Sequence, residues 1–343
     1  MAGRITISDP TLRDGNHAIG HTLSTKDITT YCRAIDGCGI DIVEVGHGNG
    51  SGASSLQLGR AKQSDQAMLE CARKNLACTK LGIHLIPGFA KLSDIDIAAA
   101  AGVDVIRVAA HCTEADITQP YIEYARNLQL SVFGVLMMTH MASAERLLLE
   151  ATKQQSYGAQ AVVLMDSAGN YVERDVHEKI GLLCRELVIP VGFHAHNNLG
   201  LAVANTLAAV EAGATIVDGT LCGFGAGAGN TQLEVLVAVL TRYGCTIGAD
   251  LLRLLGAIEL LGNLPVTQYP VIKTSNVISG FYGVCAGFER HVTRAAKTFG
   301  VPPETIYREL AKCNAVAGQE DLIIEVASRL GLVAETSPNK MVS

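Results

Sequence analysis

The sequence has few charged residues, no excess of basic ones and no long apolar run, and each of these scarcities excludes a class of protein. Charged residues make up 17% of the 343 residues and hydrophobic ones 48%, so the chain has the apolar surface that a disordered protein lacks. Its 27 basic and 33 acidic side chains give a net charge of −6, which excludes a basic field for nucleic acid. No apolar stretch approaches the ~20 residues that a membrane-spanning helix needs. We therefore expect a folded protein that binds neither nucleic acid nor a membrane.

The ten cysteines are scattered through the chain rather than clustered as in a small disulfide-stabilised protein. No secretory apolar segment begins the sequence, because residues 1–4 lead directly into the strand-like Ile5-Thr6-Ile7. Both observations predict reduced cysteines in a cytoplasmic protein, most of them packed as small apolar core residues.

A helical stretch, a glycine and a short run of β-branched residues recur along the chain. The four clearest copies begin at Gly39, Gly102, Gly158 and Gly213. Such a glycine ends a helix in the left-handed conformation, and the run after it begins a buried strand. Further strand candidates lie at residues 5–9, 80–86, 130–138 and 190–196. Eight strands, most of them separated by helical stretches, predict an α/β fold, the (β/α)₈ TIM barrel. A doubly wound sheet is the rival, but residues 10–15 are not the glycine-rich turn that it requires.

After about Gly262 the pattern changes to prolines and periodic apolar stretches, with helices expected at residues 303–313 and 319–330. We therefore expect two domains, a barrel over residues 1–262 and a helical C-terminal appendage over residues 263–343.

Polar and titratable residues collect where the predicted strands end, which is the catalytic face of such a barrel. His194 and His196 are two residues apart on one strand, so their side chains share a face. Asp14, after the first strand, is expected to complete a metal site with them, because the first and seventh strands both border the eighth. Two imidazoles and a carboxylate with open positions favour a divalent ion, Mn²⁺ first, with Mg²⁺ or Co²⁺ as alternatives. The competing interpretation is a pair of structural histidines bonded to neighbouring loops.

Residues 9–15, Asp-Pro-Thr-Leu-Arg-Asp-Gly, resemble the first-strand signature of the 3-hydroxy-3-methylglutaryl-CoA lyase-like metal-dependent TIM barrels. Within that superfamily the chain resembles the 4-hydroxy-2-oxovalerate aldolases of aromatic and steroid catabolism. The segments that carry this closer resemblance are residues 15–18, 44–48, 111–116, 136–141, 225–230 and 318–321. The resemblance extends over almost the whole chain, including the tail.

The resemblance implies a carbon–carbon lyase, a divalent-metal-dependent pyruvate aldolase. Such an enzyme cleaves a 4-hydroxy-2-oxoacid, similar to 4-hydroxy-2-oxopentanoate, to pyruvate and an aldehyde by retro-aldol chemistry. It also implies a small-molecule substrate, an oligomeric assembly and an acylating acetaldehyde dehydrogenase partner that docks on the helical tail.

Individual roles follow from the same resemblance. Arg13 is expected to stabilise the enolate, and His17 to remove the 4-hydroxyl proton as the base. The competing interpretations are a buried ion pair between Arg13 and a carboxylate at a strand end, and for His17 a role in orienting other side chains. Ser167 is expected to contact substrate, as are Arg13 and the metal ligands Asp14 and His194. His21, His47, His111 and His140 are expected to orient other side chains or anchor loops.

Two positions depart from the family pattern. Cys285 occupies the place of a tyrosine that reaches into the active site, and His84 the place of an apolar residue near the aldehyde end of the substrate. Because both side chains differ from those of the family, the resemblance alone does not predict which substituent the enzyme accepts at C4 of the substrate. Two alternative functions stay open at this stage: an acyl-CoA Claisen-type synthase or lyase of the same superfamily, and a partner subunit whose barrel has lost catalysis.

Overall fold

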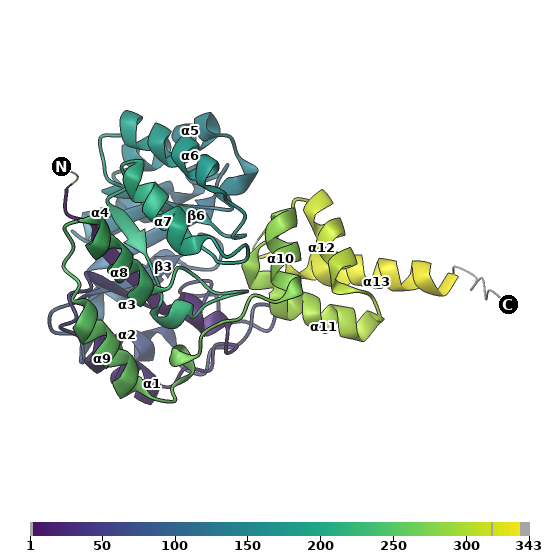
Figure 1. Cartoon of the computed structure of the whole chain (residues 1–343), viewed down its shortest axis with the longest axis horizontal. Helices are drawn as coiled ribbons and strands as arrows, with labels where there is room; N and C mark the ends of the chain where they lie inside the picture. Colours follow the sequence, from purple (N-terminus) through teal and green to yellow (C-terminus); the bar gives the residue numbers. More distant parts are fainter. Residues whose placement is uncertain (1–2, 317, 337–343) are drawn as a thin grey trace.

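The computed structural model describes residues 3–316 and 318–336, and a closed barrel of eight parallel strands forms its first part (Figure 1). Each strand pairs with the next, and the eighth pairs with the first. The strands are β1 Thr6–Leu12, β2 Ile42–Val45, β3 Lys80–Leu85, β4 Val105–His111, β5 Ser131–Met137, β6 Ala161–Asp166, β7 Val191–Ala195 and β8 Ile216–Asp218. The predicted (β/α)₈ barrel is therefore confirmed, and the doubly wound alternative is excluded.

Helices follow the strands and form the outer layer of the barrel. They are α1 Thr25–Ile35, α2 Asp65–Arg73, α3 Leu92–Ala100, α4 Gln119–Asn127, α5 Ala144–Ser156, α6 Glu173–Glu186, α7 Ala202–Glu211 and α8 Leu233–Tyr243. Helix α1 shows why these stretches fold as they do. Ser24 and Asp27 form a capping box at its start, which satisfies two backbone N–H groups. Its buried residues Ile28, Tyr31, Cys32 and Ile35 have the spacing of one helical face.

The four glycines that were predicted to end helices all have positive φ. At Gly102, with φ of 78°, the N–H of Gly102 donates to the Ala99 carbonyl and that of Val103 to the Ala98 carbonyl. This is the paired hydrogen bonding of a helix end in the left-handed conformation. The chain is then aligned to enter β4.

Beyond the barrel, α9 Leu251–Leu261 packs beside α1 and ends at Gly262. The tail contains α10 Thr274–Tyr282, α11 Glu289–Phe299, α12 Pro303–Lys312 and α13 Glu320–Thr336, and it projects from one side of the barrel (Figure 1). These helices share a core of their own, which includes Phe288, Val292, Ile306, Tyr307 and Ile323 and reaches Met138 of the barrel. The helices expected at 303–313 and 319–330 correspond to α12 and α13. Residues 337–343 of the expected tail lie outside the described part.

The cysteines follow the prediction only in part. All ten are free, and five are buried, but Cys78 and Cys313 are exposed and the remaining three are half-buried. The expectation of core packing therefore fails for the two exposed thiols. Within residues 3–316 and 318–336, no helix combines the length and the apolar character needed to cross a bilayer.

Candidate functional site

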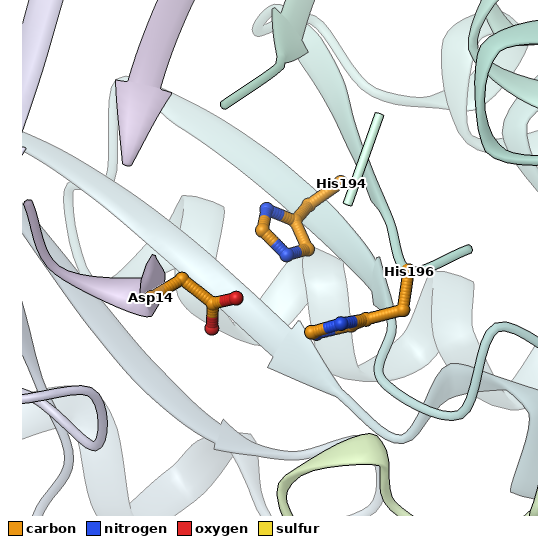
Figure 2. Close-up of side chains that lie close together, drawn as sticks. All are labelled: Asp14, His194 and His196. Carbon is orange, nitrogen blue, oxygen red and sulfur yellow. The ribbon is translucent and has the colours of Figure 1, made fainter. Parts of the chain in front are cut away.

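The predicted metal ligands meet at the mouth of the barrel. Asp14 begins the 3₁₀ helix η1 (Asp14–His17) directly after β1, His194 lies in β7, and His196 follows that strand. One ligand atom from each of the three lies within 4.8 Å of the other two, and all three side chains are buried. Figure 2 shows them pointing into one shared space from opposite sides. The structure thus brings together residues that are about 180 positions apart in sequence because β8 connects β1 and β7.

Each of the two histidine rings has one buried nitrogen without a hydrogen-bond partner in the described structure. His194 Nδ1 lies 2.9 Å from Asp218 Oδ2, and because a carboxylate only accepts, Nδ1 donates. His194 Nε2, on the other side of the ring, has no partner among the described residues, and neither has His196 Nδ1. Burial lowers the pKa of His196 to about 4. The ring of His196 is therefore neutral at neutral pH, the form in which an imidazole binds a metal.

Asp14 is held ionised in spite of its burial. Burial alone would raise its pKa, but the imidazolium of His196, which forms at the acidic pH where Asp14 titrates, and the guanidinium of Arg13 hold the pKa of Asp14 well below its usual range. Asn230 Nδ2 donates to Asp14 Oδ2 at 2.6 Å and so orients the carboxylate. Two imidazole nitrogens and one carboxylate oxygen, with unpartnered buried atoms between them, suit a divalent cation that keeps open positions for substrate.

Next to this cluster lies a chain of buried ion pairs, of which the sequence analysis considered only a pair between Arg13 and a carboxylate at a strand end. Arg13 Nε donates to Glu44 at 3.0 Å, and Arg13 Nη1 donates to Asp14 at 2.9 Å. Arg107 pairs with the same Glu44 and with Asp218 at 2.7 Å. Each of the five side chains is at most 5% exposed. The chain of ion pairs therefore connects Arg13 to the carboxylate that holds His194, and Arg13 Nη2 remains without a partner in the described structure.

The ion-pair chain gives a prediction about metal affinity. Asp218→Asn removes the carboxylate that fixes the proton on His194 Nδ1, so the affinity for a divalent cation should fall by about 10–100-fold. Titration with Mn²⁺ measures this directly. Asp9→Asn is the matched control, because Asp9 is an equally buried carboxylate that binds Thr11 and Tyr31 instead. Equal Mn²⁺ affinity in the Asp218→Asn variant and the wild type would contradict the assignment.

His17 lies at the other side of the mouth, at the end of η1. Burial lowers its pKa, partly opposed by the nearby charge of Asp14. The ring fits closely against Gly48, where an added Cβ would overlap its carbon and nitrogen atoms. From the tail, Arg290 Nη1 donates to the His17 carbonyl at 3.4 Å. His17 is thus a neutral imidazole held between the barrel and the tail.

The other mouth histidines fix loops. His21 and His47 stack with their ring centres 3.5 Å apart. His47 Nδ1 accepts from the Asn49 N–H at 3.1 Å, so its Nε2 donates to the Gly59 carbonyl at 3.0 Å. His140 Nε2 lies 2.7 Å from the Gly283 carbonyl and ties β5 to the tail. These contacts agree with the loop-anchoring role that was expected for them.

Ser167 and Cys285 lie where the barrel meets the tail. Ser167 Oγ accepts from the Met138 N–H at 3.0 Å, and its carbonyl accepts from the Ala286 N–H at 2.9 Å. Cys285 is buried next to this contact, and burial raises the pKa of its thiol to about 12. The thiol is therefore protonated at neutral pH and is not an activated nucleophile.

His84 lies inside the barrel, paired in register with Arg107 on β4. Burial and the charge of Arg13 both lower its pKa well below the usual range, and its Nδ1 has no partner among the described residues. The sequence alone did not predict whether the side chain of His84 faces into the barrel or outward. The structure shows that it points inward.

Comparisons with known proteins agree with this architecture. Residues 4–261 match the HMGL-like family, and residues 270–331 match the DmpG-like communication domain. The chain is 53% identical to a 4-hydroxy-2-oxovalerate aldolase of Spirochaeta aurantia over 95% of its own length and 96% of that protein's. It is 50% identical to one of Pectobacterium atrosepticum over 99% of both. Among solved structures, the carboxyl transferase domain of Rhizobium etli pyruvate carboxylase with pyruvate and biocytin has a TM-score of 0.81 and 17% identity. That alignment covers 99% of this chain and 63% of the other, and it shows a shared fold.

Proposed function

The chain belongs to the 4-hydroxy-2-oxovalerate aldolase family of HMGL-like barrels, and on that premise we propose that it cleaves a 4-hydroxy-2-oxoacid to pyruvate and an aldehyde. The observation that supports this most is the grouping of Arg13 and His17 beside Asp14, His194 and His196 at the barrel mouth. It provides a cation site, a fixed positive charge and a neutral base within one buried cluster.

The reaction divides among these groups. Asp14, His194 and His196 would hold a divalent cation, which would supply a Lewis acid for the carboxylate and 2-oxo group of the substrate. His17, as a neutral imidazole, accepts the proton of the 4-hydroxyl group. The C3–C4 bond then breaks, C4 leaves as the aldehyde, and the electron pair forms the enolate of pyruvate. Arg13 directs its unpartnered Nη2 to the enolate oxygen and stabilises the new charge. Return of the proton from the His17 imidazolium to C3, directly or through water, completes pyruvate and restores the neutral imidazole.

Ser167 is proposed to contact the substrate, with Arg13, Asp14 and His194. The Ser167 backbone holds the segment that begins the 3₁₀ helix η6 (Ala286–Phe288), so a substrate at Ser167 also lies close to Cys285. We propose Mn²⁺ as the cation, with Mg²⁺ or Co²⁺ as alternatives. A mixed set of imidazole and carboxylate ligands supports a borderline ion over a purely oxygen-binding one.

Pyruvate release tests the proposal. The purified protein, supplied with a racemic 4-hydroxy-2-oxopentanoate and Mn²⁺, should release pyruvate that lactate dehydrogenase converts with loss of NADH. A chelator should abolish the reaction, and Mn²⁺ should restore it. Full activity in the metal-stripped protein would refute the metal-dependent mechanism, and absence of pyruvate with every tested cation would refute the aldolase itself.

The alternative functions lose support from the same findings. The relatives at about 50% identity carry the aldolase name over nearly their full length, which weighs against the acyl-CoA synthase or lyase. The three ligand residues and Arg13 are all in place, which weighs against a barrel that has lost catalysis.

The domain division and the partner remain proposals that the tail supports. We assign residues 1–262 to the catalytic barrel and residues 263–343 to a domain that contributes to the site and docks an acylating acetaldehyde dehydrogenase. The match to a communication domain and the exposed apolar side chains Val277, Phe281 and Ile324 support this. We further propose an oligomeric, cytoplasmic enzyme of aromatic catabolism. Co-elution of the two chains on size exclusion tests the partnership.

Cys285 gives a prediction about substrate size. Cys285→Tyr introduces the family's side chain and fills space at the substrate's aldehyde end. The ratio of kcat/KM for releasing pentanal to that for releasing acetaldehyde should therefore fall by about tenfold or more. Cys285→Ser is the matched control and should keep the wild-type ratio. A melting temperature near that of the wild type shows that the tyrosine variant is folded, and an unchanged ratio in that folded variant would contradict the prediction.

A further inference from the structure

A cavity of about 850 Å³ extends from the barrel mouth between the barrel and the tail. The barrel side of the cavity includes His17 and the glycine-rich residues 224–227, and the tail side includes residues of α11. At Gly225 an added Cβ would lie 2.9 Å from Asp14 Oδ2, so the floor of the cavity borders the candidate metal centre. The cavity is therefore an approach to that centre.

Three basic residues of α11, which we call the basic wall, line this approach: Arg290, Arg294 and Lys297. Their spacing of four and then three residues places them on one face of the helix. All three are exposed. The face that carries them is the face that looks onto the cavity.

The charge of the basic wall is not neutralised by the described protein. Among the described lining residues Glu289 is the one acidic side chain, and it pairs with Lys273 at 3.2 Å. Arg294 and Lys297 have no ion pair with any acidic residue that the structure describes, and Arg290 donates to a neutral carbonyl. Like charges at this spacing destabilise a helix slightly, and the chain as a whole carries a charge of −6. Lys297 lies in the last turn of α11, where a basic side chain stabilises the helix, but Arg290 and Arg294 lie nearer its start and gain nothing of this kind.

We propose that the basic wall is an electrostatic guide that draws the anionic 2-oxoacid into the site and holds it along the approach. This inference rests on the proposed function, which makes the substrate a carboxylate. A concave surface with one sign of charge and apolar walls concentrates oppositely charged ligands. Arg290 also connects the wall to the base, because it binds the carbonyl of His17. The tail then contributes to catalysis by raising the local concentration of substrate.

A variant that lacks two charges of the basic wall, assayed at low and at high ionic strength, tests the proposed guide. Arg294→Gln with Lys297→Gln removes two charges from the wall and leaves the Arg290 contact in place. At about 0.01 M ionic strength, where charges act over ~30 Å, kcat/KM should fall roughly tenfold while kcat is retained. At about 1 M, where that range shrinks to ~3 Å, the double variant and the wild type should become equal. Pyruvate is assayed in quenched samples, so that no coupling enzyme experiences the salt.

The matched control removes two charges elsewhere. Arg185 and Arg242 are exposed in the last turns of α6 and α8, at the end of the barrel opposite the mouth. Arg185→Gln with Arg242→Gln changes the net charge equally and should leave kcat/KM and its salt dependence as in the wild type. Equal behaviour of the two double variants would overturn the guide.

A binding measurement separates this inference from the proposed function. Calorimetric titration of the Mn²⁺-loaded protein with pyruvate should show weaker affinity in the wall variant than in the control at low salt. That result in a protein that releases no pyruvate would refute the aldolase and keep the guide. Tight binding of free coenzyme A that the wall variant loses would assign the wall to phosphate groups and overturn the proposed role.

Discussion

Asp14→Asn is expected to give a folded barrel that has lost its divalent cation and with it almost all pyruvate release. A bound cation supplies several kcal/mol of transition-state stabilisation, and each 1.36 kcal/mol is a factor of ten in rate, so the loss in kcat should be roughly 10³-fold. The asparagine keeps the shape of the side chain but places an amide group where Arg13 and Asn230 both donate to Asp14. It therefore loses the charge that we propose binds the cation, and it replaces one of the two oxygens that accept from Arg13 and Asn230 by an amide nitrogen that cannot accept.

The measurement is metal content together with activity. Metal analysis of the Mn²⁺-dialysed variant should find well under one cation per chain, and added Mn²⁺ should restore little of the rate. Asp9→Asn again serves as the control, since this buried carboxylate accepts from Thr11 and Tyr31 and not from the ligand cluster. An Asp14→Asn variant that retains a full complement of cation would show that Asp14 is not a ligand.

The ligand cluster could be predicted from sequence because two simple geometric rules determine it. Residues two apart on a strand share a face, which pairs His194 with His196. A closed barrel makes the first and seventh strands neighbours of the eighth, which brings Asp14 within reach. Neither rule needs knowledge of side-chain packing. The same reasoning holds for the helix-ending glycines, whose backbone conformation a single residue type reveals.

The ion pairs beneath the cluster could not be predicted in this way. Glu44, Arg107 and Asp218 lie in short strands that are buried on both faces, so alternation of polar and apolar residues does not show which side chains point inward. Their partners come from different strands, and only the register of the closed sheet matches them. The one available signal was a charge within each apolar strand, since a charge there needs a partner.

The ion pairs also explain how the site tolerates its own charges. Asp14, Glu44 and Asp218 carry three negative charges, and Arg13 and Arg107 carry two positive ones, which leaves one negative charge in excess. A divalent cation reverses this to one positive charge, and the carboxylate of a 2-oxoacid then brings the buried cluster to neutrality. Burial of uncompensated charge is costly, so the five side chains together favour binding of a divalent cation, and the cluster with that cation favours an anionic substrate.

Arg13→Lys is the second change for which we expect a large effect, because it keeps the charge and removes the planar fork. The guanidinium donates to Glu44 through Nε and to Asp14 through Nη1, and its Nη2 has no partner in the described structure and is available to the substrate. A lysine ammonium is a single point charge on a flexible chain, so it cannot donate hydrogen bonds to Glu44, Asp14 and the substrate at the same time. We expect kcat to fall by about 10²–10³-fold, the usual cost of losing one preorganised donor to a developing oxyanion.

Metal content and stability distinguish this loss from a structural one. Glu44 keeps its partner Arg107 and Asp14 keeps Asn230, so the lysine variant should bind Mn²⁺ and unfold near the temperature of the wild type. Arg146→Lys, at a partly exposed arginine that pairs with the buried Glu150 away from the ligand cluster, is the matched control and should leave kcat unchanged. If Arg13→Lys loses its cation together with its activity, Arg13 acts by holding Asp14 in place. If the cation stays and kcat falls, the guanidinium acts on the enolate itself.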